Sequence, residues 1–196
     1  MKRIFDVLFS LAVLLLLFPL LLVIGILIKL DSTGGIFYLQ KRVGKNFREF
    51  SIIKFRTMRI GAEKGGLLTV GEKDNRVTRI GYYLRKYKLD ELPQFLNVLQ
   101  GDMSVVGPRP EVKKYVDLYT EEQKKVLTVK PGITDLASIK YSNENEVLLK
   151  YPDAEDAYVK EIMPRKLEMA LEYVKHANIA TDLRILFLTL QKIIFS

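Results

Sequence analysis

Two adjacent carboxylates, Asp90 and Glu91, have the residue types best suited to chemistry in this sequence. They stand where an apolar helical pattern begins. Free amide groups and the dipole at a helix start keep a carboxylate ionised, and an ionised carboxylate can attack phosphorus. Its neighbour can hold a divalent cation, and oxygen ligands together with phosphate suit Mg²⁺. The alternative is structural, because Asp and Glu are also ordinary capping residues of a helix's first turn.

Arg109 stands between two prolines, Pro108 and Pro110. Proline fixes its own φ angle and pushes the preceding residue towards an extended conformation, so this arginine sits on stiff backbone. A guanidinium held in this way is a good fork for phosphate. A loop arginine in a surface ion pair is the alternative.

The composition excludes several other kinds of chemistry. The 196 residues include no cysteine and one histidine, which excludes disulfides, cysteine nucleophiles, thiolate metal sites and histidine-rich zinc sites. Lys and Arg number 31 against 23 Asp and Glu, and the formal charge of +8 favours an anionic partner such as phosphate, nucleic acid or a lipid headgroup. Any reaction must therefore use carboxylates, lysines, arginines, hydroxyls or a bound metal.

Periodic patterns around the dyad predict the elements that position it. Residues 77–87 form an amphipathic helical pattern, and residues 92–99 form a second one that stops at Gly101. These two helices place the dyad at the amino end of the second. Upstream, β-branched and aromatic runs at residues 36–39 and 47–55 predict a small β-hairpin.

Further helices are expected over residues 120–129, 153–175 and 179–195. The first opens with a capping box and ends in a turn at residues 130–132, and Pro164 restarts the second. The third has few polar positions, which suits a helix in the membrane interface, although an ordinary packing helix fits equally. The glycine-rich stretch 61–71 lacks the ending of a phosphate loop, so no nucleotide role is assigned to it.

An uncharged apolar stretch near the amino terminus predicts a membrane segment. Residues 7–28 would form a helix of about 33 Å, against a roughly 30 Å hydrocarbon core. Pro19 lies near the middle, where it kinks a helix at a cost of about 3 kcal/mol. Lysines and arginines flank both ends, and positive flanks stay on the cytoplasmic side. We therefore favour a re-entrant hairpin bent at Phe18 and Pro19 over a single span.

Several spaced motifs together resemble a known family over most of the chain. The motifs are the apolar segment containing Pro19, Lys54-Phe55-Arg56-Thr57-Met58, Leu89-Asp90-Glu91-Leu92-Pro93-Gln94, Gly101-Asp102-Met103-Ser104 continuing to Gly107-Pro108-Arg109-Pro110, and Lys130-Pro131-Gly132-Ile133-Thr134. The sequence resembles the bacterial sugar transferases of the monotopic polyprenyl-phosphate phosphoglycosyl transferase family. At this length it is similar to minimal members, which carry only the membrane hairpin and the catalytic domain.

The resemblance implies a reaction and roles for the site residues. A sugar phosphate moves from a UDP-sugar to a polyprenyl phosphate, such as undecaprenyl phosphate, releasing UMP and starting synthesis of a surface glycan such as exopolysaccharide, lipopolysaccharide or capsule. Asp90 is the implied nucleophile and forms an aspartyl-phosphosugar intermediate, and Glu91 holds Mg²⁺. The implied phosphate-handling residues are Arg85, Arg109, Lys54 and Arg56. Phosphoryl transfer depends mainly on alignment and charge neutralisation, which such residues supply.

Two departures limit the resemblance. Many members have serine before the membrane proline, where this chain has Phe18. Many also continue with glycine and then Ala-Gln-Val-Asn-Gly after Thr134, where this chain has Asp135-Leu136-Ala137-Ser138-Ile139-Lys140. The contacts of this region with donor or acceptor are therefore not carried over.

The expected protein is a mostly helical α+β chain with an N-terminal re-entrant membrane helix hairpin (residues 1–30), a small β-hairpin and interfacial amphipathic helices. Residues 31–196 form its catalytic domain at the cytoplasmic face of the bacterial inner membrane, with membrane lipids as partners and no nucleic acid. The alternative is a non-catalytic, membrane-tethered module whose basic residues between Lys41 and Arg59 bind anionic lipid or nucleic acid.

Overall fold

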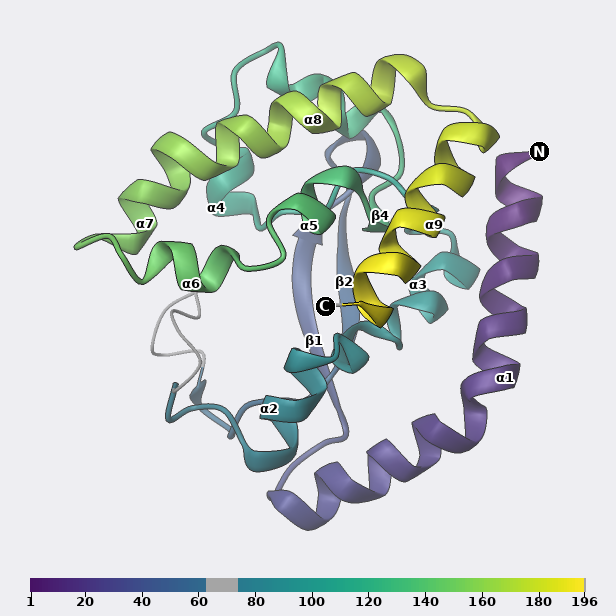
Figure 1. Cartoon of the computed structure of the whole chain (residues 1–196), viewed down its shortest axis with the longest axis vertical. Helices are drawn as coiled ribbons and strands as arrows, with labels where there is room; N and C mark the ends of the chain where they lie inside the picture. Colours follow the sequence, from purple (N-terminus) through teal and green to yellow (C-terminus); the bar gives the residue numbers. More distant parts are fainter. Residues whose placement is uncertain (63–73, 196) are drawn as a thin grey trace.

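The computed structural model describes residues 1–62 and 74–195 and shows a mostly helical α+β chain with small sheets (Figure 1). The α-helices are α1 (Lys2–Asp31), α2 (Arg79–Lys86), α3 (Gln94–Gln100), α4 (Lys113–Val116), α5 (Leu136–Lys140), α6 (Glu144–Leu148), α7 (Ala154–Ala157), α8 (Met163–His176) and α9 (Ile179–Ile194). The strands are β1 (Phe37–Val43), β2 (Glu49–Phe55), β3 (Ser104–Val106) and β4 (Gly132–Thr134). The predicted class is confirmed. Most of the glycine-rich stretch 61–71 lies outside the described residues.

The predicted β-hairpin is present. β1 and β2 pair antiparallel, with Phe37 opposite Phe55, and the rings of these two residues stack at 5.5 Å. A 3₁₀ turn, η1 (Lys45–Phe47), joins the strands. Asn46 and Phe47 have φ angles of 53° and 63° there, so Phe47 belongs to the turn rather than to the second strand as expected. The hairpin directs the end of β2 towards the chain segment that carries the dyad.

A second, parallel strand pair lies in segments that the sequence indicated only as turns. β3 and β4 pair with Ser104 opposite Gly132 and Val106 opposite Thr134. The two backbones approach closely because Gly107 and Gly132 lack side chains. A Cβ atom on Gly132 would lie 2.1 Å from the Gly107 nitrogen. The turn predicted at residues 130–132 is thus the start of a buried strand, which glycine makes possible.

Replacing Gly132 with alanine is expected to destabilise the fold. Backbone atoms cannot yield as a flexible side chain can, so we expect a loss of at least about 2 kcal/mol in the free energy of unfolding. Denaturation followed by circular dichroism measures this loss. Gly35→Ala is the matched control, since its Cβ would meet only an ordinary contact at 3.5 Å. Equal stability of the two variants would contradict the close approach.

The predicted helix starts are largely confirmed by their caps. Thr78 accepts a hydrogen bond from the Gly81 amide at 3.0 Å and opens α2. The capping box at residues 120–123 forms both of its reciprocal hydrogen bonds, at 2.9 and 3.2 Å. It opens a 3₁₀ helix, η4 (Gln123–Thr128), rather than the expected α-helix. Between α7 and α8 the chain makes a π-helical turn, η5 (Tyr158–Ile162), and Pro164 lies in the first turn of α8.

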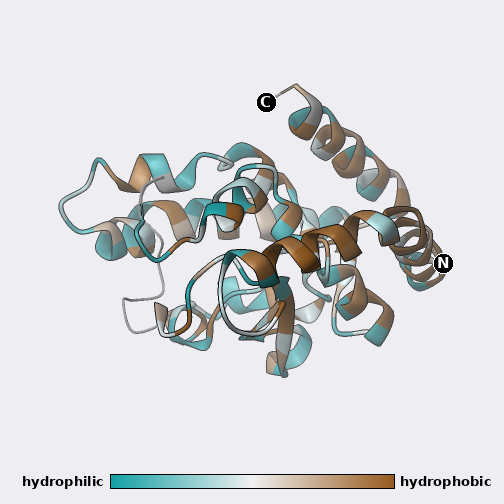
Figure 2. Cartoon of the chain, turned by 90° about the horizontal axis from the view of Figure 1, so that it is seen from below, coloured by the Kyte–Doolittle hydropathy of each residue, from teal (hydrophilic) through white to brown (hydrophobic). Residues whose placement is uncertain are grey.

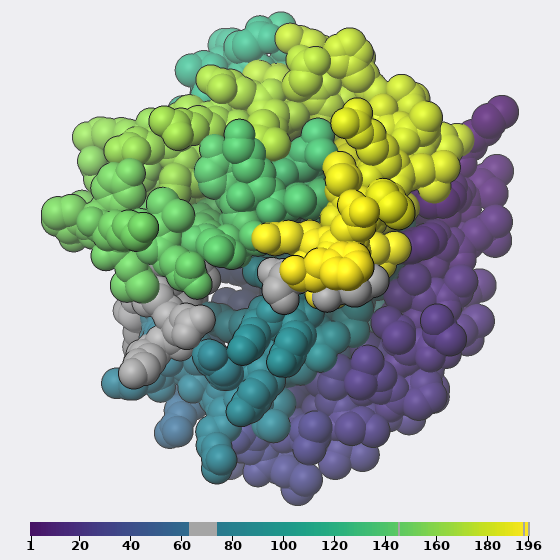
Figure 3. All heavy atoms as spheres, viewed as in Figure 1, coloured from purple at the N-terminus to yellow at the C-terminus, as the bar shows by residue number. Residues whose placement is uncertain are grey.

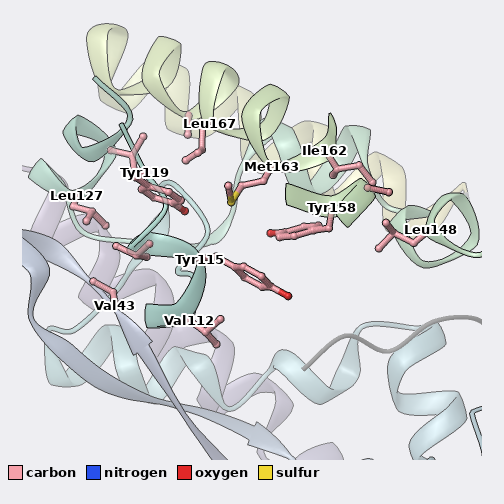
Figure 4. Close-up of a cluster of buried hydrophobic side chains, with 14 residues drawn as sticks. Val43, Val112, Tyr115, Tyr119, Leu127, Leu148, Tyr158, Ile162, Met163 and Leu167 are labelled. Atoms are coloured by element: carbon pink, nitrogen blue, oxygen red, sulfur yellow. The ribbon is translucent and has the colours of Figure 1, made fainter. Parts of the chain in front are cut away.

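The buried apolar residues that the structure describes form three clusters, and each of them includes a residue of the β-hairpin. One cluster lies beneath α8 and includes Tyr115, Tyr119, Tyr158, Met163 and Leu167 (Figure 4). A second joins β2, α3, β3 and α9 through Ile52, Val98, Met103, Val105 and Ile185. A third packs Ile24 and Ile28 of α1 against Phe55 and Leu84. The amino-terminal helix is therefore anchored to the folded domain.

Helix α1 is continuous through Pro19 and bends along its length (Figure 1). The expected break at Phe18 and Pro19 is thus a bend within one helix. Among the described residues, α1 is long and apolar enough to cross a membrane by length and composition. Much of its apolar surface is exposed (Figure 2), including Leu8, Leu11, Leu15, Leu16, Phe18, Leu22, Val23, Ile26 and Leu30.

Polar contacts fix the amino end of α1 to the domain. The buried carboxylate of Asp6 accepts hydrogen bonds from the Ser104 hydroxyl at 2.9 Å and the Val105 amide at 3.0 Å. Lys2 forms an ion pair with the buried Asp182 of α9. These contacts bring α1 and α9 together on one face of the molecule (Figure 3). An aspartate directly before an uncharged apolar stretch is a sequence signal that could have indicated such a docking contact.

Candidate active site

Asp90 and Glu91 lie in a 3₁₀ turn, η3 (Leu89–Glu91), between α2 and α3. Lys88 precedes the turn in the left-handed conformation, with φ 56°, and reverses the chain between the helices. Helix α3 begins only at Gln94, with Pro93 as its N-cap, and no side-chain cap is formed at either element. The capping interpretation of the two carboxylates is therefore wrong.

Glu91 is held between two cations from distant parts of the chain. Lys54 of β2 lies 2.9 Å from Oε1, and the Arg109 guanidinium donates to both carboxylate oxygens. Arg109 comes from the turn that follows β3, so three elements separated in sequence meet at one side chain. The sequence named all three residues, and the structure brings them into contact.

The two cations determine the protonation of Glu91. Burial raises the pKa of this carboxyl, but the charges and hydrogen bonds of Arg109 and Lys54 outweigh burial and hold the pKa well below its usual range. The same contact with Glu91 raises the pKa of the Arg109 guanidinium. Glu91 is thus a fixed anion in a fixed cationic setting.

Asp90 has the opposite environment. It is 8% exposed, and among the described residues no side-chain cap hydrogen bond is formed at its turn. Burial and the charge of Glu91 raise the pKa of Asp90, against the opposing charges of Lys54, Arg85 and Lys88. The expected helix-start amides do not stabilise the Asp90 carboxylate, because α3 begins only at Gln94, and the nearby cations Lys54, Arg85 and Lys88 are what oppose the effect of burial. A desolvated carboxylate with few hydrogen bonds is a stronger nucleophile than a solvated one.

Arg85 lies within electrostatic reach of the dyad. Its Nε donates to the Thr57 hydroxyl at 2.8 Å, and its charge lowers the pKa of Asp90. Burial lowers the pKa of the Arg85 guanidinium itself. Its helix packs tightly on the end of β2, because a Cβ on Gly81 would lie 2.1 Å from the Thr57 carbonyl oxygen. Arg85 therefore joins the cluster of Asp90, Glu91, Lys54 and Arg109.

Arg56 is not part of this cluster. Its guanidinium donates to the backbone carbonyls of Ser32 at 2.9 Å, Thr33 at 2.6 Å and Gly35 at 2.6 Å. It also donates to the Ser32 hydroxyl at 2.9 Å. These contacts clamp the connection between α1 and β1, which gives Arg56 a structural role that its position in a basic motif did not reveal.

The chain matches the bacterial sugar transferase family over residues 1–196. It belongs to that family. The match covers α1 as well as every residue of the site, so the family assignment and the geometry concern the same part of the chain. The predicted resemblance is confirmed.

Three relatives illustrate the range of this sugar transferase family. The chain is 38% identical to the UDP-N-acetylgalactosamine-undecaprenyl-phosphate N-acetylgalactosaminephosphotransferase of Aeromonas hydrophila, covering 98% of this chain and 43% of the relative. It is 35% identical to the UDP-glucose:undecaprenyl-phosphate glucose-1-phosphate transferase of Escherichia coli (strain K12), covering 98% and 40%. It is 38% identical to the exopolysaccharide production protein PSS of Rhizobium leguminosarum bv. phaseoli, covering 95% and 92%. The chain thus spans less than half the length of the first two relatives.

The donor atoms of this candidate site suit Mg²⁺ in kind. Magnesium usually takes one or two carboxylates and completes its shell with phosphate oxygens and water. Glu91 Oε2 accepts one hydrogen bond, from Arg109, and so keeps a lone pair for a metal. Among residues 1–62 and 74–195 no cluster of three or more acidic or histidine side chains could hold a metal alone. The residues present fit a metal that arrives with a phosphate substrate.

Proposed function

We propose that this chain transfers a sugar 1-phosphate from a UDP-sugar to a polyprenyl phosphate, with release of UMP. The observation that carries the proposal is the convergence of Lys54, Arg85 and Arg109 on two adjacent carboxylates, a buried Asp90 and a half-buried Glu91. Such a cationic cluster neutralises phosphates, and the buried Asp90 carboxylate is suited to attack. The names of the relatives supply the substrate class, including undecaprenyl phosphate as acceptor.

In the proposed first step Asp90 attacks the sugar-bearing phosphorus. A bond forms between a carboxylate oxygen and phosphorus, the bond to the UMP oxygen breaks, and UMP leaves. In the second step an oxygen of the polyprenyl phosphate attacks the same phosphorus and the aspartyl bond breaks. The carboxylate is regenerated, so no net proton or electron is required. Two displacements through a covalent intermediate separate the donor and acceptor events in time.

The other residues hold charge during these steps. Arg109 and Lys54 keep Glu91 ionised and present cations beside the phosphorus. Arg85 lies on the Asp90 side and can bind phosphate oxygens there. Bound Mg²⁺, held by Glu91, would neutralise the diphosphate of the donor. Each of these groups stabilises negative charge where it develops.

A lipid-borne acceptor requires that the site lie at a membrane surface. We propose that α1 enters and leaves one leaflet through its bend and that α9 lies in the interface, at the cytoplasmic face of the bacterial inner membrane. The exposed apolar residues of α9 and its C-cap support this: Leu183, Phe187, Leu190 and Ile193 in the helix and Phe195 at the cap. The positively charged flanks of α1 favour one side of the membrane for both of its ends.

A single introduced tryptophan can test the position of α9. The chain contains no tryptophan, so Phe187→Trp carries one fluorophore at a side chain that is 60% exposed. In vesicles of brominated phospholipid we expect strong quenching of its fluorescence, because bromine on acyl chains quenches only nearby indoles. Tyr151→Trp, on the segment between α6 and α7, is the control and should not be quenched. Equal quenching of both would contradict the interfacial position.

The reaction itself is tested on the purified, detergent-solubilised chain. Incubation with Mg²⁺ and a panel of UDP-sugars, without acceptor, should add the mass of one sugar phosphate to the intact protein. Addition of undecaprenyl phosphate should then remove this mass and sustain UMP release. The absence of both adduct and UMP with every donor would reject the proposed function.

The alternative of a basic binding module receives little support from the side chains. Of its basic residues, Arg42 pairs with Glu111, Lys54 pairs with Glu91, and Arg56 clamps a loop. These three cations are used within the protein, whereas Lys41, Lys45, Arg48 and Arg59 remain exposed and can face an anionic membrane surface.

A further inference from the structure

Asp135 is a buried carboxylate with two backbone hydrogen-bond donors. It follows β4 and is 4% exposed. One oxygen accepts from the Ser138 amide at 2.6 Å and so caps the start of α5. The other accepts from the Arg109 amide at 3.2 Å. One side chain therefore connects the start of a helix to the turn that carries the phosphate-site arginine.

The register of the parallel strands brings these residues together. Val106 of β3 pairs with Thr134 of β4, so the residues just beyond the two strands lie at the same edge. The Gly107 amide donates to the Thr134 carbonyl at 3.1 Å and extends the pairing. Asp135 thus faces the turn from a fixed position rather than from a loose loop.

The Arg109 amide is the backbone hydrogen-bond donor that this turn can offer to the Asp135 carboxylate. Pro108 and Pro110 have no N–H group, so the Arg109 amide is the backbone donor available between residues 108 and 110. Beyond this amide, the Arg109 side chain extends to Glu91. A hydrogen bond that fixes the Arg109 amide therefore fixes the backbone position from which the Arg109 side chain extends.

We propose that Asp135 is a positioning residue that holds the Arg109 backbone, and so aims its guanidinium at Glu91 and the transferred phosphate. The inference rests on the proposed function for its effect on turnover, but its structural part stands on the hydrogen bonds alone. Residues that orient a catalytic group matter because misplacement of about 1 Å can cost roughly 10²-fold in rate.

The variant Asp135→Asn separates the two contacts of the side chain. Asparagine is as good an N-cap as aspartate, so its single oxygen can still accept from Ser138. Its amide group then faces the Arg109 N–H as a second donor and cannot accept from it. Asp135→Ser makes the same separation with a shorter side chain, because a serine cap oxygen cannot reach both donors.

Asp153→Asn is the matched control. Asp153 caps α7 by accepting from the Glu155 and Asp156 amides, both at 3.0 Å, and lies outside the candidate site. We expect Asp135→Asn and Asp135→Ser to lower kcat by roughly 10- to 100-fold while the melting temperature stays near that of the control. Turnover of either Asp135 variant equal to that of Asp153→Asn overturns the proposal.

Hydrogen exchange at residue 109 gives a readout independent of activity. We expect the Arg109 amide, resolved by fragmentation mass spectrometry, to exchange faster in Asp135→Asn, while the Ser138 amide keeps its protection. Unchanged exchange at Arg109 also overturns the proposal. If the unmodified protein forms no adduct with any donor, the proposed function fails, and this exchange still decides whether Asp135 holds Arg109.

A double-mutant cycle distinguishes positioning from a general structural effect. In a protein that already carries Arg109→Lys, the Asp135→Asn change should lower kcat by much less than it does in the unmodified protein. The reason is that the guanidinium which Asp135 positions is already absent. Fully multiplicative losses would show that Asp135 acts on turnover by another route and would overturn the proposal.

Discussion

Asp90→Asn is expected to form no sugar-phosphate adduct and to lose at least roughly 10³-fold in turnover. The amide has the shape of the carboxylate but cannot act as the attacking anion. The fold should survive, because Asp90 is a buried carboxyl whose pKa is raised by burial and by the charge of Glu91. Replacing it with a neutral group removes an unfavourable charge, so stability at neutral pH should stay equal or rise. Intact mass spectrometry, UMP release and thermal unfolding measure the three quantities.

Asp117→Asn is the control for this variant. Asp117 forms an exposed ion pair with Lys113 at 2.6 Å, and its side chain is 57% exposed. Its adduct and turnover should match those of the unmodified protein. Undiminished turnover in Asp90→Asn would reject Asp90 as the nucleophile.

The rate of adduct formation should also depend on pH through Asp90. The attacking form is the ionised carboxylate, and burial raises its pKa above that of an ordinary aspartate. The rate should therefore fall on the acid side at a higher pH than an exposed aspartate would cause. Single-turnover rates of adduct formation across a pH series, in the absence of acceptor, measure this fall in rate at acid pH.

Glu91→Gln is expected to cost both activity and stability. Glutamine keeps the shape of glutamate but removes the anion with which Lys54 and Arg109 both pair. The two cations are then held less firmly for phosphate binding, and the proposed metal ligand is lost. We expect turnover to fall by roughly 10²- to 10³-fold. We also expect the free energy of unfolding at pH 7 to fall by about 2 kcal/mol, since a partly buried pair is broken from one side. Steady-state UMP release at varied Mg²⁺ and chemical denaturation provide the two measurements.

The stability difference has a defined pH dependence. Because the pKa of Glu91 is lower in the folded than in the unfolded chain, its contribution is present above the ordinary value of 4.5. The contribution is lost as the pH falls through the lowered folded pKa. The difference in the free energy of unfolding between Glu91→Gln and the unmodified protein should therefore become smaller in acid and stay constant near neutral pH.

Glu155→Gln provides the matched control for Glu91. Glu155 pairs with Lys114 across elements, but their side chains are 48% and 54% exposed. Exposed pairs contribute little, so this change should leave stability and turnover nearly unchanged. A loss of stability in Glu155→Gln equal to that in Glu91→Gln would contradict the assignment of the effect to the buried cluster.

The sequence predicted the elements whose periodicity is local. The β-hairpin, α2, α3 and α8 appear where alternation, helical spacing and the stop at Gly101 indicated them. The parallel pair β3 and β4 was missed because each strand is three residues long and pairs across a long separation. Local patterns carry no signal for a partner that far away. The close approach of Gly107 and Gly132 is visible only when both backbones are in place.

Residue types indicated the chemistry of the site but not which groups each side chain contacts. The family resemblance named Asp90, Glu91, Arg85, Arg109 and Lys54, and these five residues lie together in the fold. The same reasoning assigned Arg56 to phosphate, whereas its guanidinium clamps the backbone of residues 32–35. Asp135 was noted only as a departure from the family pattern, although its position after β4 gives it two buried contacts.

The sequence by itself determined the family, the apolar amino-terminal helix and the identity of a carboxylate pair accompanied by basic residues, because each is written in contiguous or regularly spaced side chains. Only the tertiary structure decided that Glu91 is the anion locked between Lys54 and Arg109 and that Asp90 is the desolvated partner. That division depends on burial and on contacts among β2, η3 and the turn after β3. Adjacent residues of the same charge acquire different protonation behaviour only when distant segments place cations beside one and leave the other with few donors.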